Sequence, residues 1–264
     1  IQNLKRTYVL SEGGIYVIET DTGDYPSNAD SKNQDNSQFF PLQEVANTSA
    51  ISLNGQMIYG STTGNAVWFN PSIGFTANTY NIGSLVDVSP TLVTGLRTDR
   101  GMMRNAIITG SNDGTVIAID AKDIQQLWTV SLLDTVAAPV SYGTNSRIIR
   151  NEDIPRSSVF IAGTDRYLRS VDLRTGRPRW RVLTESPLED SPFVSKTAVY
   201  QRIPNVGLAA FQAFPDEFSG NQDWIAEDIL GTVITTTKDG KLVCWDEQEK
   251  ILQIADPRKG GIVA

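Results

Sequence analysis

Short apolar runs recur along the chain, and each lies just before a tight-turn sequence. TYVL (7–10), QMIYG (56–60), NAIITG (105–110) and SVFIAG (158–163) are four of these runs, and TAVYQ and TVITT follow later. After each turn comes a second run in which apolar and polar positions alternate, which is the periodicity of a half-buried strand. Each pair of runs therefore predicts a β-hairpin.

The turns between the paired runs carry residues that favour two-residue hairpin loops. Asp113-Gly114 and Asp239-Gly240 are such pairs, because their backbone readily adopts positive φ angles. In the fourth repeat Arg166 stands where the others have glycine, so that turn must differ. The pattern occurs six times at spacings of roughly 34 to 52 residues, which suit one four-stranded propeller blade each.

Two repeats share a longer signature. Its positions are Ala118, Asp120, Asp123, Ile124 and Trp128 in one repeat, and Ser170, Asp172, Thr175, Gly176 and Trp180 in the next. This signature resembles the A-x-D-x-x-T-G-x-x-x-W docking motif of the PQQ-like (quinoprotein-like, BamB-type) β-propeller repeat family. The resemblance implies that the tryptophan wedges between neighbouring blades, a role that falls to Trp128, Trp180 and Trp224.

The resemblance predicts an all-β fold, a β-propeller of six four-stranded blades, or of seven or eight if blades lie outside this sequence. Residues 1–264 would form a single domain, and the abrupt ends read as part of a longer protein. A generic β-sandwich is the competing fold, but it gives no reason for the signature to recur in register. WD-repeat blades are a second competitor, although they use a histidine that this chain lacks.

Composition removes several classes of function. A net charge of −7 and a pI near 4.7 argue against nucleic acid as a partner. Cys244 is the only cysteine and there is no histidine, so the commonest general base and transition-metal ligand are both missing. We therefore predict no catalytic, cofactor-binding or metal-binding residue, and interpret the recurrent Asp120, Asp172 and Asp246 as turn caps.

Four long excursions interrupt the repeats, at 21–46, 95–104, 143–156 and 215–223. By their positions between strands, all four should decorate one face of the propeller. The two middle segments form a basic patch and supply the candidate partner-binding residues. These are Arg97, Arg100, Arg104, Arg147, Arg150 and Arg156. Planar guanidinium groups suit carboxylates of a partner, but an internally paired or merely solvated surface remains an equal alternative.

The family resemblance implies a non-catalytic interaction scaffold of the bacterial cell envelope or periplasm, which binds a protein partner through the loop-decorated face. Two alternatives stay open: a degenerate or partial PQQ-dependent dehydrogenase, and a sensor domain of a larger receptor. The sequence has no apolar run long enough to span a membrane and no signal-peptide layout at its start. We also predict that Ile262–Ala264 pairs beside Thr7–Leu10 and so closes a six-bladed ring.

Overall fold

The computed structural model describes most of the first four repeats and the strands of the later ones. The described residues are 5–26, 38–97, 103–149, 152–195, 198–204, 207–214, 232–236, 242–246, 251–256 and 261–263. Within these ranges every regular element is a β-strand, and none is a helix that could cross a membrane.

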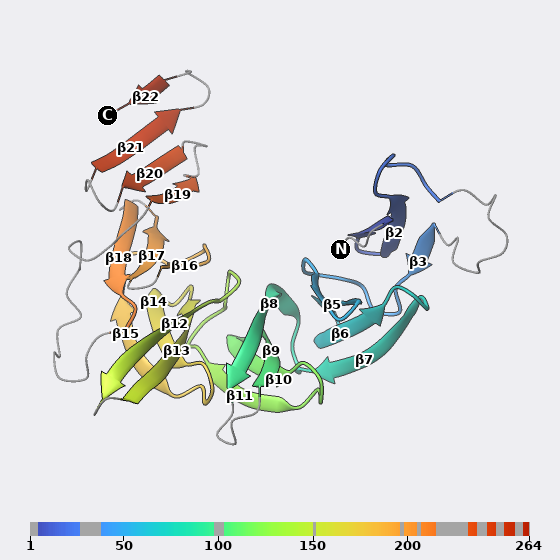
Figure 1. Ribbon diagram of the computed structural model, residues 1–264, viewed down its shortest axis with the longest axis horizontal. Helices are drawn as coiled ribbons and strands as arrows, with labels where there is room; N and C mark the ends of the chain where they lie inside the picture. The colour runs from blue at the N-terminus through green and yellow to red at the C-terminus, as the bar shows by residue number, and fades with distance from the viewer. Residues whose placement is uncertain are drawn as a thin grey trace. The chain divides into compact units, whose positions relative to one another are not determined.

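The strands form six antiparallel sheets in chain order (Figure 1). The first sheet contains β1 (Arg6–Leu10), β2 (Gly14–Glu19) and β3 (Phe39–Pro41). The second contains β4 (Ile51–Leu53), β5 (Gln56–Gly60), β6 (Asn65–Asn70) and β7 (Phe75–Asn81). The third contains β8 (Val86–Arg97), β9 (Met103–Ser111), β10 (Thr115–Asp120) and β11 (Gln126–Ser131).

The fourth sheet contains β12 (Ser141–Ile149), β13 (Glu152–Ala162), β14 (Tyr167–Asp172) and β15 (Pro178–Leu183). The fifth contains β16 (Phe193–Val194), β17 (Ala198–Ile203) and β18 (Gly207–Gln212). The sixth contains β19 (Thr232–Thr236), β20 (Leu242–Asp246), β21 (Ile251–Asp256) and β22 (Gly261–Val263). The predicted all-β fold of repeated antiparallel sheets is confirmed, with four strands in four of the sheets and three described strands in the other two.

The chain divides into two compact units. The first comprises Ile1–Tyr142, Ser157–Pro192 and Arg202–Gly207, and the second comprises Gly143–Arg156, Phe193–Gln201 and Leu208–Ala264. In the first unit the core lies between successive sheets. Tyr59 of the second sheet packs with Ile15 of the first, whereas its neighbour Ile58 packs with Ile107 of the third. Each inner sheet is thus buried on both faces, as expected for stacked blades.

The same turn follows the inner strand of four sheets. A backbone N–H donates to the carbonyl four residues earlier in Gly23→Glu19, Gly74→Asn70, Ile124→Asp120 and Gly176→Asp172, at 2.8 to 2.9 Å. The donor residue has a positive φ angle in every case, between 53° and 76°. The repeats that the sequence aligned therefore share their backbone geometry as well.

The prediction about the C-terminal run is wrong. β22 pairs antiparallel with β21, with Ile254 opposite Val263, and it completes the sixth sheet. The first sheet has only β1, β2 and β3 among the described strands. A hairpin between neighbouring strands closes a much shorter loop than a pairing between the two chain ends, so its entropic cost is lower.

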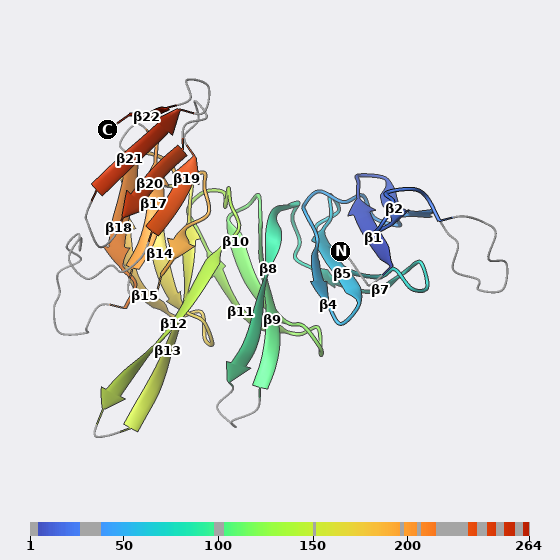
Figure 2. The ribbon, with the colours of Figure 1, turned by 45° about the horizontal axis from the view of Figure 1, so that its top comes forward.

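Two of the predicted loop excursions contain regular structure instead. β8 runs to Arg97 and β9 begins at Met103, while β12 runs to Ile149 and β13 begins at Glu152. These segments are long hairpin arms, labelled β8–β9 and β12–β13 in Figure 2. Residues 27–37 and 215–223 of the other excursions lie outside the described residues, so the prediction that all four share one face stays a prediction.

Candidate functional site

A tryptophan joins the third sheet to the fourth. Trp128 on β11 is only 5% exposed, and its indole Nε1 donates a hydrogen bond of 2.8 Å to the carbonyl of Leu173, just after β14. Its ring lies over Gly176, where an added Cβ would come within 2.9 Å of the indole. Opposite Trp128 on β10 stands the small Ala118, which leaves room for the ring. The Trp128 ring therefore fills the space between the third and fourth sheets at this turn.

Trp180 has the same register but a different environment. It lies opposite Ser170, as Trp128 lies opposite Ala118. However, Trp180 is half-buried, and its ring contacts Phe160 of its own sheet at a centroid distance of 5.9 Å. The predicted role of Trp180 as a residue that docks neighbouring blades therefore stays a prediction. Trp224, the third predicted docking residue, lies outside the described residues.

At the junction of the second and third sheets the large and small positions are exchanged. Trp68 on β6 lies opposite Asn78 on β7, so Trp68 takes the place of Ala118 and Asn78 takes the place of Trp128. Trp68 is 1% exposed and packs against the third sheet beside Ile107. Its indole Nε1 is buried without a hydrogen-bond partner among the described residues. The ring thus comes from an inner strand and fills the middle of the junction.

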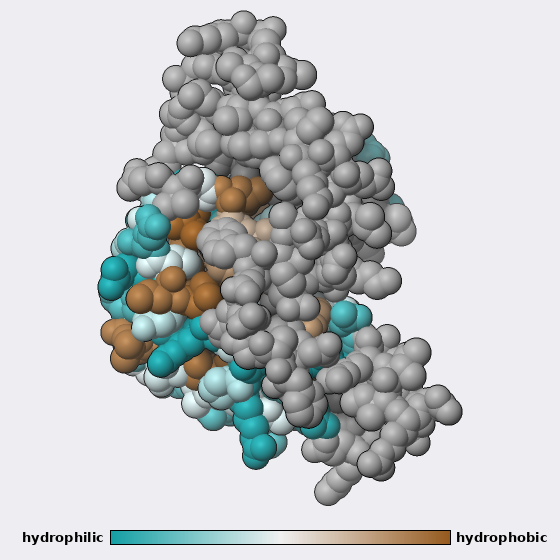
Figure 3. All heavy atoms as spheres, turned by 90° about the vertical axis from the view of Figure 1, so that its left-hand side faces the viewer, coloured by the Kyte–Doolittle hydropathy of each residue, from teal (hydrophilic) through white to brown (hydrophobic). Residues whose placement is uncertain are grey.

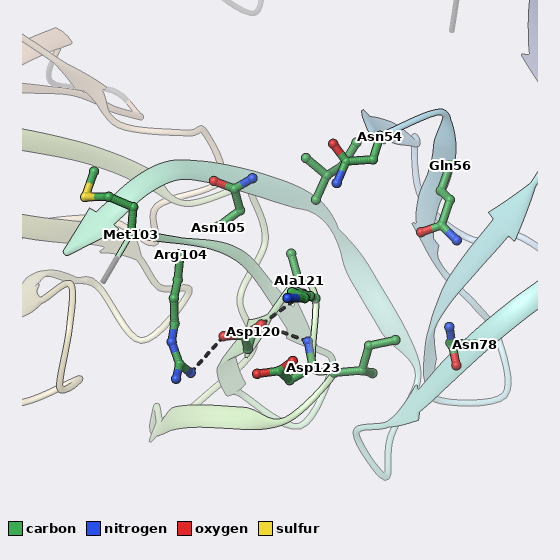
Figure 4. A pocket seen from close by; sticks show the side chains of 12 residues that line it. Asn54, Gln56, Asn78, Met103, Arg104, Asn105, Asp120, Ala121 and Asp123 are labelled. Carbon is green, nitrogen blue, oxygen red and sulfur yellow. Dashed lines mark hydrogen bonds and ion pairs between the residues drawn. The ribbon is translucent and has the colours of Figure 1, made fainter. Parts of the chain in front are cut away.

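The exchange leaves a pocket between these two sheets. It has a volume of about 600 Å³. Its lining residues are Leu53, Asn54, Gln56, Asn78, Met103, Arg104, Asn105, Asp120, Ala121, Lys122, Asp123 and Ile124. Figure 4 shows Asn54, Gln56 and Asn78 on one side of the pocket, and Met103, Arg104, Asn105 and Asp120 on the other. Sequence reasoning missed this site, because the signal is a missing tryptophan rather than a motif.

An ion pair organises the pocket wall. The carboxylate of Asp120, which is 2% exposed, accepts hydrogen bonds from the backbone N–H groups of Lys122 and Asp123, both at 2.9 Å. Its other oxygen accepts from Arg104 Nη1 at 2.9 Å (Figure 4). Burial alone would raise the pKa of Asp120, but these hydrogen bonds and the Arg104 charge outweigh burial and lower the pKa below its usual value.

Two of the three recurrent aspartates, Asp120 and Asp172, cap their turns, as the sequence predicted. Asp120 holds the turn after β10, and Asp172 Oδ1 accepts from the backbone N–H groups of Arg174 and Thr175 at 3.0 and 2.9 Å. The side chain of Asp246 lies outside the description. Among the described residues, no three Asp, Glu or Cys side chains lie together as a group that could hold a metal ion.

The six candidate arginines are only partly described. Arg104 lines the pocket in its ion pair with Asp120, and Arg156 is half-buried on β13. Arg97 and Arg147 lie on strands β8 and β12, but their side chains are outside the description, as are Arg100 and Arg150 altogether. The basic patch therefore stays a prediction.

Exposed apolar side chains come from several separate elements. Phe75 on β7, Met103 on β9 and Leu133 after β11 are all more than half exposed, at 60%, 66% and 81%. In Figure 3 brown and teal patches alternate over the coloured part of the surface. Scattered apolar residues of this kind are normal on a soluble surface. They point to no particular binding face, so the pocket is the best-defined candidate site.

Sheets of repeated design, joined by aromatic residues at a recurrent turn, define a PQQ-like β-propeller protein. The family described as "Outer membrane protein assembly factor BamB" matches residues 11–263, and the chain belongs to this family.

Two solved structures have a similar fold. The crystal structure of BamB from Moraxella catarrhalis is 15% identical, with a TM-score of 0.60, over 99% of this chain and 85% of that one. The crystal structure of the computationally designed Ika8 protein is 14% identical, with a TM-score of 0.62, over 96% of this chain and 71% of that one. No curated protein sequence matches the chain.

Proposed function

We propose that the chain is a non-catalytic scaffold that binds protein partners during the assembly of outer membrane proteins, in the periplasm or cell envelope of a bacterium. The observation that carries this proposal is the match of residues 11–263 to the BamB family. The two solved structures support the fold alone, because their sequence identities are 15% and 14%. Function on a repeat scaffold usually depends on variable surface segments, so the partner site must be argued from this chain's own residues.

The hairpin arms β8–β9 and β12–β13 are two candidate contact surfaces, each considered by itself. They carry Arg97, Arg100, Arg147 and Arg150 on a chain whose net charge is −7. An acidic region of a partner would be attracted to these arms, and arginine can hold a carboxylate through two parallel hydrogen bonds. Arg104 is set apart from this group because it is engaged with the buried Asp120.

The test uses the whole chain, immobilised and exposed to a solubilised cell-envelope fraction of its native bacterium, with captured proteins identified by mass spectrometry. A variant with Arg97, Arg100, Arg147 and Arg150 all replaced by serine should capture the same partner less well at an unchanged melting temperature. Added salt should weaken the wild-type complex in the same direction. Arg104 is left intact, since its loss would strand a buried carboxylate.

The matched control replaces two exposed arginines of the turn after β14, Arg174 and Arg177, with serine. It changes charge without touching the arms and should leave capture unchanged. Full retention of binding by the four-arginine variant would rule out both arms as contact surfaces. Stoichiometric uptake of pyrroloquinoline quinone with calcium, followed by absorption spectroscopy, would overturn the scaffold proposal itself.

A further inference from the structure

We propose that the pocket between the second and third sheets binds an extended peptide segment of a protein partner. This inference rests on the proposed function and names a second contact site for it. On the side of the third sheet the pocket is lined by Met103–Asn105 at the start of β9 and by Asp120–Ile124 at the end of β10 and in the turn after it. It belongs entirely to the first compact unit.

The pocket exists because no aromatic ring covers the turn at this junction, whereas a ring covers the turn at each neighbouring junction. At the first junction, a Cβ on Gly74 would lie 2.7 Å from the ring of Phe40, and at the third a Cβ on Gly176 would lie 2.9 Å from Trp128. At the second junction the corresponding turn residue is Ile124, and the strand position that holds Trp128 elsewhere holds Asn78. Both of these residues line the pocket instead of closing it.

The chemistry of the lining suits a polypeptide backbone. Asn54, Gln56, Asn78 and Asn105 are carboxamides, and each can donate and accept hydrogen bonds as a peptide group does. Leu53, Met103, Ala121 and Ile124 supply apolar surface for a side chain. The formal charges of Arg104, Lys122, Asp120 and Asp123 cancel, so the pocket does not demand a strongly charged ligand.

A backbone carbonyl offers a further anchor. The N–H of Ala121 donates to the carbonyl of Asn105, as the N–H of Leu173 donates to the carbonyl of Ser157 one sheet later. Ala121 is therefore the counterpart of Leu173, whose carbonyl accepts the indole N–H of Trp128. A peptide N–H in the pocket could donate to the carbonyl of Ala121, as the indole N–H of Trp128 donates to the carbonyl of Leu173 at the next junction.

The pocket wall is already organised for binding. The two backbone bonds to Asp120 fix its carboxylate, and that carboxylate fixes Arg104 at 2.9 Å. Because a guanidinium has five N–H donors, Arg104 can hold Asp120 and still donate to a ligand carbonyl. Preorganisation of this kind lowers the entropic cost of binding.

Size and composition decide between ligand classes. A volume of about 600 Å³ lies within the range of roughly 300–1,000 Å³ that is usual for ligand pockets. None of the twelve lining residues is aromatic, so no ring is present on which a base or a sugar face could stack. Carboxamides with a short apolar strip favour a peptide over a nucleotide or a glycan.

The experiment selects linear 12-residue peptides from a random phage-displayed library on the wild-type chain, then measures fluorescein-labelled copies by fluorescence polarisation. Asn78→Phe fills the pocket from the exposed edge strand β7. A second variant, Gln56→Ala with Lys122→Ala, removes polar lining and guards against misfolding of the first. Thr79→Phe is the matched control, since it adds the same ring to the neighbouring exposed position, which does not line the pocket.

We expect selected peptides to bind wild type and Thr79→Phe equally, and both pocket variants about tenfold more weakly, a loss of about 1.4 kcal/mol. Failure to select any peptide, or equal binding by all variants, would refute the inference. Binding of chito-oligosaccharides with the same dependence on the pocket variants would assign the site to glycans instead. If both pocket variants retain the partner captured from the envelope fraction, the peptide site fails while the scaffold function stands.

Discussion

The second and third junctions of the first compact unit share the same turn but differ in whether an aromatic ring covers it. Both contain the same turn, with a backbone bond of 2.8 to 2.9 Å that closes on Asp120 or Asp172. At the third junction the ring of Trp128 comes from the outer strand and covers that turn. At the second the ring of Trp68 comes from the inner strand, and the turn opens on a pocket. At this register, the strand that carries the tryptophan decides whether the turn is covered.

The exchange also changes how the indole N–H is satisfied. Trp128 donates to a carbonyl across the junction, whereas the N–H of Trp68 is buried and has no partner among the described residues. A buried donor without a partner costs about 1–3 kcal/mol, and a typical hydrogen bond contributes about 1 kcal/mol net. The third junction therefore gains packing and a hydrogen bond from one side chain, while the second gains packing alone.

The largest expected effect breaks the closed junction. Trp128→Ala should lower the free energy of unfolding by about 3–5 kcal/mol, because it empties a buried site in the core between two sheets. Trp180→Ala should cost clearly less, since Trp180 is half-buried. Urea unfolding followed by circular dichroism would measure both. A larger loss for Trp180→Ala would mean that Trp180 is the main docking residue after all.

A smaller effect isolates the contact between ring and turn. Gly176→Ala places a Cβ 2.9 Å from Trp128 on a backbone with a φ of 68°. Gly23→Ala meets a similar φ of 76° with nothing within 4 Å of the new Cβ. The left-handed backbone alone should cost each variant about 1–2 kcal/mol. The loss in the free energy of unfolding should be larger for Gly176→Ala than for Gly23→Ala, because the new Cβ must displace the Trp128 ring. Equal losses in urea unfolding would disprove that close contact.

The smallest expected effect concerns pH at the open junction. The pKa of Asp120 is lowered in the folded chain, although burial opposes this, because the backbone N–H groups and Arg104 stabilise its charged form. A lowered pKa gives stability that is present above the unfolded carboxyl pKa of about 3.9 and is lost as the pH falls through the folded value. Asp120→Asn should therefore be less stable than wild type at pH 7, and the gap should narrow below about pH 4.

Urea midpoints measured from pH 7 to about pH 3 would follow that gap. Asp123→Asn, on the exposed side of the same turn, is the control and should show little difference from wild type at any pH. A gap between wild type and Asp120→Asn that stays constant over this range would show that the carboxylate charge contributes nothing to stability.

The sequence predicts what depends on local pattern and misses what depends on pairs of strands. The hairpins, the turn caps and the shared register of Trp128 and Trp180 follow from alternation, glycine placement and motif spacing. The exchange of Trp68 and Asn78 does not, because it is visible only when two strands are placed side by side. The strand content of segment 95–104 was hidden by its charged residues, and the pairing of β22 with β21 depended on a competition between two edges.

The buried indoles of the two junctions also act as built-in reporters of motion. An N–H exchanges with deuterium from the solvent only when its surroundings open, and the opening energy of a protein differs from region to region. The hydrogen bond from Trp128 to Leu173 can break only if the third and fourth sheets separate there. The N–H of Trp68 is shielded by packing between the second and third sheets without such a bond. The deuterium-exchange rates of the two indole N–H groups would therefore report the opening of the two blade boundaries separately. The N–H of Trp68, at the boundary beside the pocket, should exchange first.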